Sequence, residues 1–223
     1  MIKKYSALFL GLFVGVSAIH LWGQINGYSI LADTTKAMVI PTLGIWAFIR
    51  YNPSKRYGIA LFFSWIGDLL LIPDGTSFFM IGIMSFLLTQ LLYCNLMMQR
   101  LEGSFKQQFT KKKALLPLIL LGSYLIGILG LMGGSLGPLL FPVTLYATAL
   151  SITGFLGILI ARENPKKEAN ILALGTLLFV LSDSMIAFDA FFFNTPQFTY
   201  WIMATYVPAQ YCIAVFLAKN QSQ

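Results

Sequence analysis

The chain has 223 residues, of which 57% are hydrophobic and only 10% are charged. Soluble domains carry roughly 25% charged residues, so this composition and a mean hydropathy of +0.76 exclude an ordinary soluble domain. The net charge of +7 comes from basic residues that cluster between apolar runs, which is typical of membrane topology signals and not of nucleic-acid binding. We therefore expect one integral membrane domain over residues 1–223, with no nucleic acid and no protein as partner.

Eight apolar segments are candidate membrane-crossing helices, for which about 20 residues are needed. They lie at residues 5–23, 31–49, 57–72, 78–98, 114–132, 136–160, 169–193 and 199–218. Glycines and a proline between residues 133 and 138 separate the fifth segment from the sixth. The third segment is short, as though its polar end opened into a cavity. The expected fold is all-α, a polytopic membrane bundle of eight transmembrane helices.

The basic residues support this count because they occur in alternate loops. They precede the first segment and follow the second, fourth, sixth and eighth: Lys3, Lys4, Arg50, Lys55, Arg56, Arg100, Lys106, Lys111, Lys112, Lys113, Arg162, Lys166, Lys167 and Lys219. By the positive-inside rule, both termini lie in the cytoplasm. We expect a multi-pass protein of the inner, or cytoplasmic, cell membrane. Lys36 is the one exception, and we place it in the first outer turns of the second helix.

Two aspartates lie inside apolar runs and are the leading functional candidates. Asp68 follows Gly67 in the third segment, and Asp183 follows Ser182 in the seventh. An ionisable residue in hydrocarbon costs roughly several kcal/mol of free energy, and such a residue usually faces a bundle interior or a wet cavity. The predicted topology places Asp68 toward the outer half of the membrane and Asp183 near its middle.

Two carboxyl groups at similar depth suit acid–base chemistry. One that is kept protonated donates a proton, while a second, ionised one acts as base or stabilises positive charge. Lys36 is either the counter-ion of an aspartate, a binding group for phosphate, or a side chain that extends to the outer interface. The alternative for both aspartates is structural: pairing with Lys36 or with backbone groups that only holds helices together.

Further polar residues occur in the fourth, sixth and eighth segments. They are Gln90, Tyr93, Tyr146, Tyr206 and Gln210. A buried hydroxyl or amide must find a hydrogen-bond partner, so interhelical bonding is the alternative to a substrate-binding role for each of them. His20, at the outer end of the first helix, is expected to be an interfacial residue.

A parallel 4+4 repeat is a further expectation. The third and seventh segments each carry a small residue followed by aspartate. The fourth and eighth each carry an aromatic residue four positions before a glutamine, as in Phe86 and Gln90, or Tyr206 and Gln210. An offset of four helices preserves orientation in the membrane, which a parallel duplication requires.

Metal and cofactor motifs are missing from the sequence. His20 is the single histidine, and the two cysteines, Cys94 and Cys212, lie in separate apolar runs. The sequence has no G-x-S-x-G, P-loop or H-E-x-x-H pattern. We expect neither a metal nor a cofactor, and neither a serine lipase nor an intramembrane metalloprotease.

Several short patterns follow one another along the chain. They are Tyr57-Gly58, Phe63-Ser64 and Gly67 to Leu71; Phe79, Gly82, Phe86-Leu87, Gln90 and Tyr93; Pro142-Val143 and Tyr146; Gly175 to Ser184 and Ala187; and Tyr206 with Ala209-Gln210. In this order and in an eight-helix setting, they resemble the YhhN family of integral membrane lysoplasmalogenases, known from bacteria and animals. The similarity extends over nearly the whole chain from about residue 33 on.

The resemblance implies hydrolysis of the vinyl-ether bond of lysoplasmalogens to a fatty aldehyde and a glycerophospho-alcohol. The substrate is then a lysophospholipid among the membrane lipids. Asp68 and Asp183 match aspartates that are thought to be catalytic in the family, and Lys36 matches its lysine in the second helix. The family usually has Lys-Pro where this chain has Lys36-Ala37, and many members have histidine at Gln90. If that histidine assists proton transfer or binds the head group, Gln90 predicts another substrate preference or slower turnover.

Two other functions stay open. A small-molecule or proton-coupled transporter would use the aspartates to relay protons or bind cations. A lipid-binding or scaffold protein would bind its ligand without turnover. Proton flux in liposomes separates the first from the hydrolase, and ligand-dependent thermal stabilisation without product identifies the second.

Overall fold

The protein is all-helical over the residues that the computed structural model describes, 2–193 and 196–219. That part of the chain has eight long helices: α1 Ile2–Ile25, α2 Ser29–Tyr51, α3 Lys55–Leu70, α4 Thr76–Met98, α6 Leu115–Met132, α7 Leu140–Glu163, α8 Lys167–Phe188 and α9 Pro196–Leu217. Each falls on one of the eight predicted segments, with ends shifted by a few residues. The all-α prediction is confirmed. It was possible because hydropathy alone locates helices of this length.

Four short elements complete the described chain: α5 Phe105–Gln108, the 3₁₀ turns η1 Lys112–Ala114 and η2 Gly137–Leu139, and the π-helical turn η3 Asp189–Phe193. The hydropathy pattern does not predict α5, which lies in a polar loop and begins with a capping box formed by Ser104 and Gln107. The predicted break between the fifth and sixth helices is confirmed. There Gly137 adopts a φ of 48°, a conformation that glycine reaches without strain.

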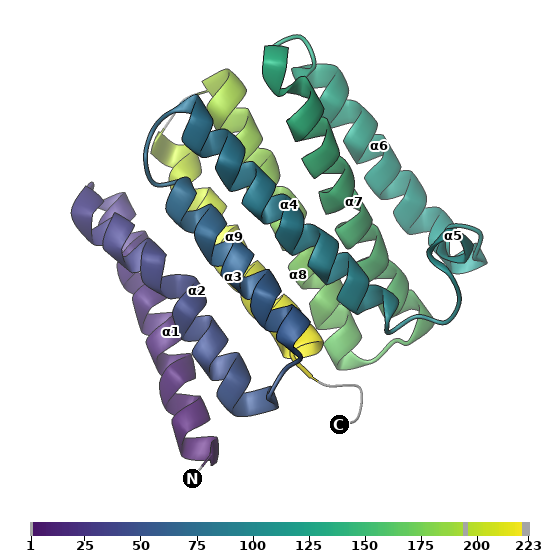
Figure 1. The fold of residues 1–223 in the computed structure, drawn as a ribbon, viewed down its shortest axis with the longest axis horizontal. Helices are drawn as coiled ribbons and strands as arrows, with labels where there is room; N and C mark the ends of the chain where they lie inside the picture. The colour runs from purple at the N-terminus through teal and green to yellow at the C-terminus, as the bar shows by residue number, and fades with distance from the viewer. Residues whose placement is uncertain (1, 194–195, 220–223) are drawn as a thin grey trace.

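The long helices form two layers. In Figure 1, α2, α3, α4, α7 and α6 lie across the view, while α8 and α9 run behind α3 and α4. The most extensive packing is between α8 and α9, between α1 and α2, and between α3 and α4. As a result α4 and α9 occupy the centre of the bundle.

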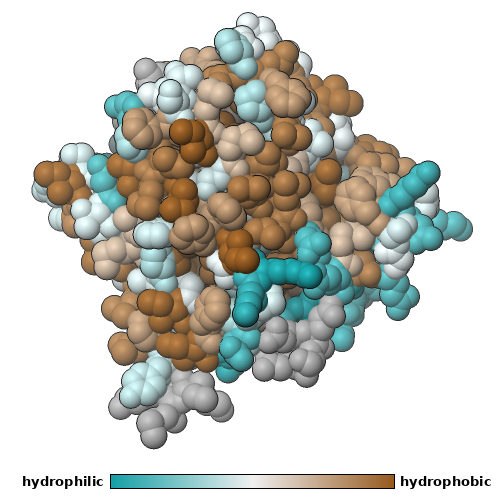
Figure 2. All heavy atoms as spheres, viewed as in Figure 1, coloured by the Kyte–Doolittle hydropathy of each residue, from teal (hydrophilic) through white to brown (hydrophobic). Residues whose placement is uncertain are grey.

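Six of the long helices, or helical stretches, are long and apolar enough to cross a membrane: residues 5–25, 76–98, 112–132, 137–163, 167–193 and 198–217. The protein is therefore a multi-pass membrane protein. The helices α2 and α3 do not meet the criterion, and α3 has only 16 residues. Eight spans with both termini in the cytoplasm remain a prediction. Apolar side chains cover most of the face in Figure 2, and hydrophilic ones gather at its lower and right edges.

The contacts of two residues were not predicted. His20 is 1% exposed, and its Nδ1 lies 2.8 Å from the carbonyl oxygen of Ala32 across the α1–α2 contact. Because α2 begins at Ser29, Lys36 lies beyond its first two turns. Its Nζ donates a hydrogen bond of 3.3 Å to the carbonyl oxygen of Leu71, toward the end of α3. The close packing of α1 on α2 accounts for the burial of His20, which a hydropathy pattern does not reveal.

Candidate active site

Asp68 lies in the last turn of α3 and is 3% exposed. Its Oδ2 accepts a hydrogen bond of 2.9 Å from the hydroxyl of Tyr206 on α9. The Tyr206 oxygen also lies 2.8 Å from the hydroxyl of Ser64, one turn before Asp68 on the same face of α3. Tyr206 is thus the side chain that joins the carboxylate to the neighbouring helix.

The hydrogen bonds continue from Tyr206 to a second tyrosine. The side-chain amide of Gln210 donates to the oxygens of both Ser64, at 2.6 Å, and Tyr206, at 3.0 Å. Its carbonyl accepts from the hydroxyl of Tyr93 on α4, at 2.9 Å. The hydrogen bonds of this network therefore run in one direction. Each N–H or O–H in the network has an acceptor, and the last donor, the hydroxyl of Tyr206, faces Asp68. A satisfied buried network of this kind holds its members in one geometry.

Lys36 supplies the positive charge nearest to Asp68. The two side chains interact electrostatically, as does Lys36 with the exposed Asp33. No ion pair within 4.0 Å forms between Lys36 and an acidic side chain of the described residues. With Nζ on the Leu71 carbonyl, the ammonium group lies at the C-terminal end of α3, the helix that carries Asp68.

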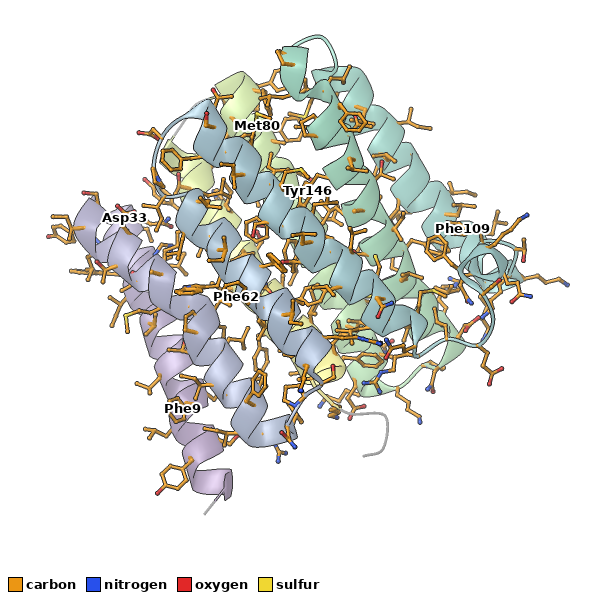
Figure 3. The ribbon with its side chains drawn as sticks, in the orientation of Figure 1. Phe9, Asp33, Phe62, Met80, Phe109 and Tyr146 are labelled. Atoms are coloured by element: carbon orange, nitrogen blue, oxygen red, sulfur yellow. The ribbon has the colours of Figure 1, made fainter. Side chains whose placement is uncertain are left out.

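Asp183 lies on α8 and is 9% exposed. Its Oδ2 accepts a hydrogen bond from the hydroxyl of Tyr146 on α7, and Figure 3 shows Tyr146 near the middle of the bundle. Both residues line a pocket between α4, α7 and α8 with a volume of about 40 Å³, which is room for a water molecule or two. Its other lining residues are apolar: Leu71, Phe79, Ile83, Phe86, Val143, Ile186, Ala187 and Phe191.

Three aromatic rings form a cluster next to the two aspartates. Phe86, Phe179 and Tyr206 contact one another edge to face, with ring centroids 5.5–6.3 Å apart. Phe86 packs on Gly67, where an added Cβ would lie 2.6 Å from the ring. The same Phe86 ring also lines the pocket of Asp183. One side chain therefore contacts both halves of the site.

The two aspartates are close enough for their charges to interact, although their helices are not principal packing partners. The helix α3 packs mainly on α4 and α2, and α8 packs mainly on α9 and α7. The central pair α4 and α9 fills the space between them and contributes Phe86 and Tyr206. The site around the two carboxyl groups is therefore built by side chains from six helices: α2, α3, α4, α7, α8 and α9.

Gln90 is fully buried on α4, one turn after Phe86. Its amide lies beside the Tyr146 hydroxyl, but neither the amide oxygen nor the nitrogen completes a hydrogen bond within the described part of the chain. An unpaired buried amide costs about 1–3 kcal/mol. Gln90 is thus a polar group next to Asp183 with donor and acceptor capacity to spare.

Each of the residues predicted for the site lies near one of the two aspartates. Tyr93, Tyr206, Gln210 and Lys36 surround Asp68, and Tyr146 and Gln90 lie at Asp183. Their roles in binding or catalysis stay predictions. The sequence reasoning did not single out Ser64, Phe86 or Phe179 as site residues. The signal for Ser64 is its spacing of four from Asp68, which places both on one helix face.

Each of the two glutamines lies in the group around the aspartate from the other half of the chain. Gln210, from the second half of the chain, bonds to the group around Asp68 in the first half. Gln90, from the first half, lies at the tyrosine that bonds Asp183 in the second half. A 4+4 duplication would produce this exchange, but the repeat itself remains a prediction. Among residues 2–193 and 196–219, no three histidine, cysteine, aspartate or glutamate side chains converge as a metal site requires.

Comparison with known proteins agrees with the resemblance in the motifs. The YhhN family profile matches residues 31–217. The chain is 28% identical over 181 residues to lysoplasmalogenase TMEM86A of Bos taurus, covering 80% of this chain and 71% of that protein. It is 25% identical over 206 residues to lysoplasmalogenase TMEM86A of Homo sapiens, covering 84% and 79%. No solved structure matches significantly. The chain belongs to the YhhN family.

Proposed function

We propose that this protein is a membrane hydrolase that cleaves the vinyl-ether bond of lysoplasmalogens by carboxylate acid–base chemistry. The observation that carries the proposal is the pair Asp68 and Asp183: both are buried, and each accepts a hydrogen bond from a tyrosine. The curated relatives named lysoplasmalogenases support the substrate class.

The reaction needs one acid, one water and no redox step. A proton is transferred to the β-carbon of the vinyl ether, which leaves an oxocarbenium ion at the carbon bonded to oxygen. Water adds to that carbon and loses a proton to a base. The resulting hemiacetal then breaks its bond to the glycerol oxygen, which takes up a proton, and releases a fatty aldehyde and a glycerophospho-alcohol. Glycosidases use paired carboxyl groups in the same way, around a similar cation.

The surroundings of the two carboxyl groups suggest how the roles are divided. Asp183 lines the apolar pocket, where the carbons of the vinyl ether would fit, and we assign it as the proton donor. Asp68 has the ammonium group of Lys36 nearby and a hydrogen bond from Tyr206, and we assign it as the ionised partner that stabilises the cation and positions water. Tyr146 holds Asp183 so that its second oxygen is free to face the substrate.

We assign Lys36 to the substrate phosphate, because its ammonium group bonds to the carbonyl oxygen of Leu71, a residue that lines the same pocket. The pocket as it stands admits water and not a lipid chain. The rings of Phe79 and Phe191 meet edge to face with centroids 5.9 Å apart and both line it. We expect this pair to separate when the substrate enters.

The test is mass spectrometry of lysoplasmalogen incubated with the purified protein. We expect a fatty aldehyde and a glycerophospho-alcohol in equal amounts. An acyl lysophospholipid with the same head group is the matched control, because it has an ester in place of the vinyl ether and should give no aldehyde. Turnover of the acyl lipid alone would contradict the proposal.

A proton-coupled transporter is the second candidate, and one observation favours it. The ordered hydrogen bonds from Tyr93 through Gln210 and Tyr206 to Asp68 would also serve as a proton relay. Proton flux into liposomes that contain the protein, measured with a pH-sensitive dye, decides between the two. Flux in the absence of aldehyde release would favour the transporter.

A further inference from the structure

A large cavity lies at the opposite end of the bundle from the candidate active site. It has a volume of about 710 Å³ and is lined by the ends of α4, α7 and α9 and the start of α8. Along α8, Asp183 is 14 residues beyond Ala169 of the cavity wall, or roughly 21 Å at 1.5 Å per residue. The positive-inside rule predicts that this end is cytoplasmic, and hydrophilic side chains gather here in Figure 2.

The charge around this cavity is not balanced. Five basic residues line it, Arg100, Lys111, Lys113, Lys166 and Lys219, together with three glutamates, Glu102, Glu163 and Glu168. Two of the lysines are paired: Lys111 with Glu163 at 2.7 Å and Lys219 with Glu168 at 3.2 Å. Among the described residues, Arg100, Lys113 and Lys166 form no ion pair, which leaves an excess of positive charge on the cavity wall.

Arg100 is positioned to present its free donors. Its guanidinium carbon lies 5.6 Å from the centre of the Phe216 ring, and one N–H donates to the carbonyl oxygen of Lys219 at the end of α9. A guanidinium group has five N–H donors in a planar fork that matches phosphate oxygens. The remaining donors of Arg100 are therefore available beside the cavity.

Two further features favour an anionic group. The helix α8 starts at the cavity, where the positive end of its dipole adds to the charge of its N-cap residue Lys166 and Glu168 in the first turn offsets part of it. Apolar side chains also line the cavity, among them Leu101, Ile160 and Phe216. Basic pockets between membrane helices on the cytoplasmic side are typical sites for anionic lipid head groups.

We propose that this cavity binds a ligand with a negatively charged phosphate group, held by Arg100, Lys113 and Lys166. The ligand chemistry fits an anionic phospholipid of the adjacent leaflet and also a free phosphate compound. The site is separate from the proposed catalytic one, so the proposal holds whether or not the protein is a hydrolase.

The test is isothermal titration of the full chain in detergent with dihexanoyl phosphatidylglycerol, dihexanoyl phosphatidylcholine and inorganic phosphate. We expect saturable binding of phosphatidylglycerol and little of the zwitterionic phosphatidylcholine. If inorganic phosphate also binds, a soluble phosphate compound is a sufficient ligand. If inorganic phosphate does not bind, the ligand is the lipid. Equal affinity for both lipids, or binding of neither anion, overturns the proposal.

A matched pair of variants locates the binding. The double change Lys113→Gln with Lys166→Gln removes two charges from the cavity wall, and Lys112→Gln with Lys167→Gln removes two charges from the adjacent exposed positions outside the lining. We expect the first to weaken binding about tenfold or more and the second by less than about twofold. Equal losses in both contradict the proposal, and so does a loss caused by Lys36→Gln alone, since Lys36 lies at the other end.

Discussion

The hydroxyl of Tyr206 donates a hydrogen bond of 2.9 Å to Oδ2 of Asp68, across 138 residues of sequence. This contact joins α9 to the end of α3 and holds the carboxylate next to Lys36. Tyr206 is also the residue at which the polar network and the aromatic wall of Phe86 and Phe179 meet. Changes at this residue should therefore affect the chemistry more than the fold.

Replacing Tyr206 by Phe removes the hydrogen bond to Asp68 but keeps the ring. Ser64 and Gln210 still bond to each other at 2.6 Å, so few buried groups lose all their partners. Because a hydrogen bond to a charged group contributes about 1.5–3 kcal/mol, we expect aldehyde release to fall roughly 10- to 100-fold. Initial rates measure the effect, with exposed Tyr5→Phe as control. Unchanged rates would show that the contact is only structural.

Gln90→Leu separates a binding role from a structural one. The Gln90 amide is buried and its atoms complete no hydrogen bond within the described chain. Leucine should therefore leave the stability unchanged or raise it by about 1 kcal/mol. If Gln90 serves the substrate or the attacking water, aldehyde release falls at the same time. Thermal unfolding and initial rates are measured on the same preparation, and a large loss of stability would assign the residue to the scaffold.

Gly67→Ala tests the contact between the two halves of the site. The added Cβ would lie 2.6 Å from Cε2 and 2.7 Å from Cδ2 of Phe86, so the ring must move. We expect a loss of about 1–3 kcal/mol in stability and a lower rate, because Phe86 lines the pocket of Asp183. Gly127→Ala in α6 is the control, since nothing lies within 4 Å of its added Cβ, and alanine there should stabilise the helix by about 0.5–1 kcal/mol.

Lys36→Gln distinguishes phosphate binding from charge compensation. If Lys36 binds the substrate phosphate, the variant should raise KM about tenfold or more for lysoplasmalogen. It should then differ little from the wild type on an alkenyl glycerol that lacks phosphate. If Lys36 mainly stabilises ionised Asp68, kcat should fall equally for both substrates. The ratio of kcat/KM values for the two lipids decides between these roles.

The positions of the long helices were predictable because hydrophobic burial in a membrane imposes runs of about 20 apolar residues. The short helix α5 was not, since its four residues in a polar loop depend on the local capping bonds of Ser104 and Gln107. The burial of His20 was not predictable either, because it depends on how closely α1 packs on α2, which a polarity pattern does not contain.

The candidate site was predictable residue by residue but not as an arrangement. A carboxylate in an apolar run is costly wherever it lies, so Asp68 and Asp183 could be found without a structure. Their partners could not be assigned, because Tyr206 and Tyr146 come from helices far away in sequence. The role of Phe86 depends on the absence of a side chain at Gly67, a packing relationship that periodicity does not reveal.

The most direct test of the central claim is aldehyde release by Asp68→Asn and Asp183→Asn, with exposed Asp74→Asn as control. In D₂O the wild type should place one deuterium on the carbon next to the aldehyde, which reports protonation of the β-carbon. Each of the first two variants should lose at least about 100-fold in rate while it remains folded by size exclusion and thermal unfolding, and the control should keep the wild-type rate. Wild-type turnover in either Asp68→Asn or Asp183→Asn would contradict the proposed mechanism.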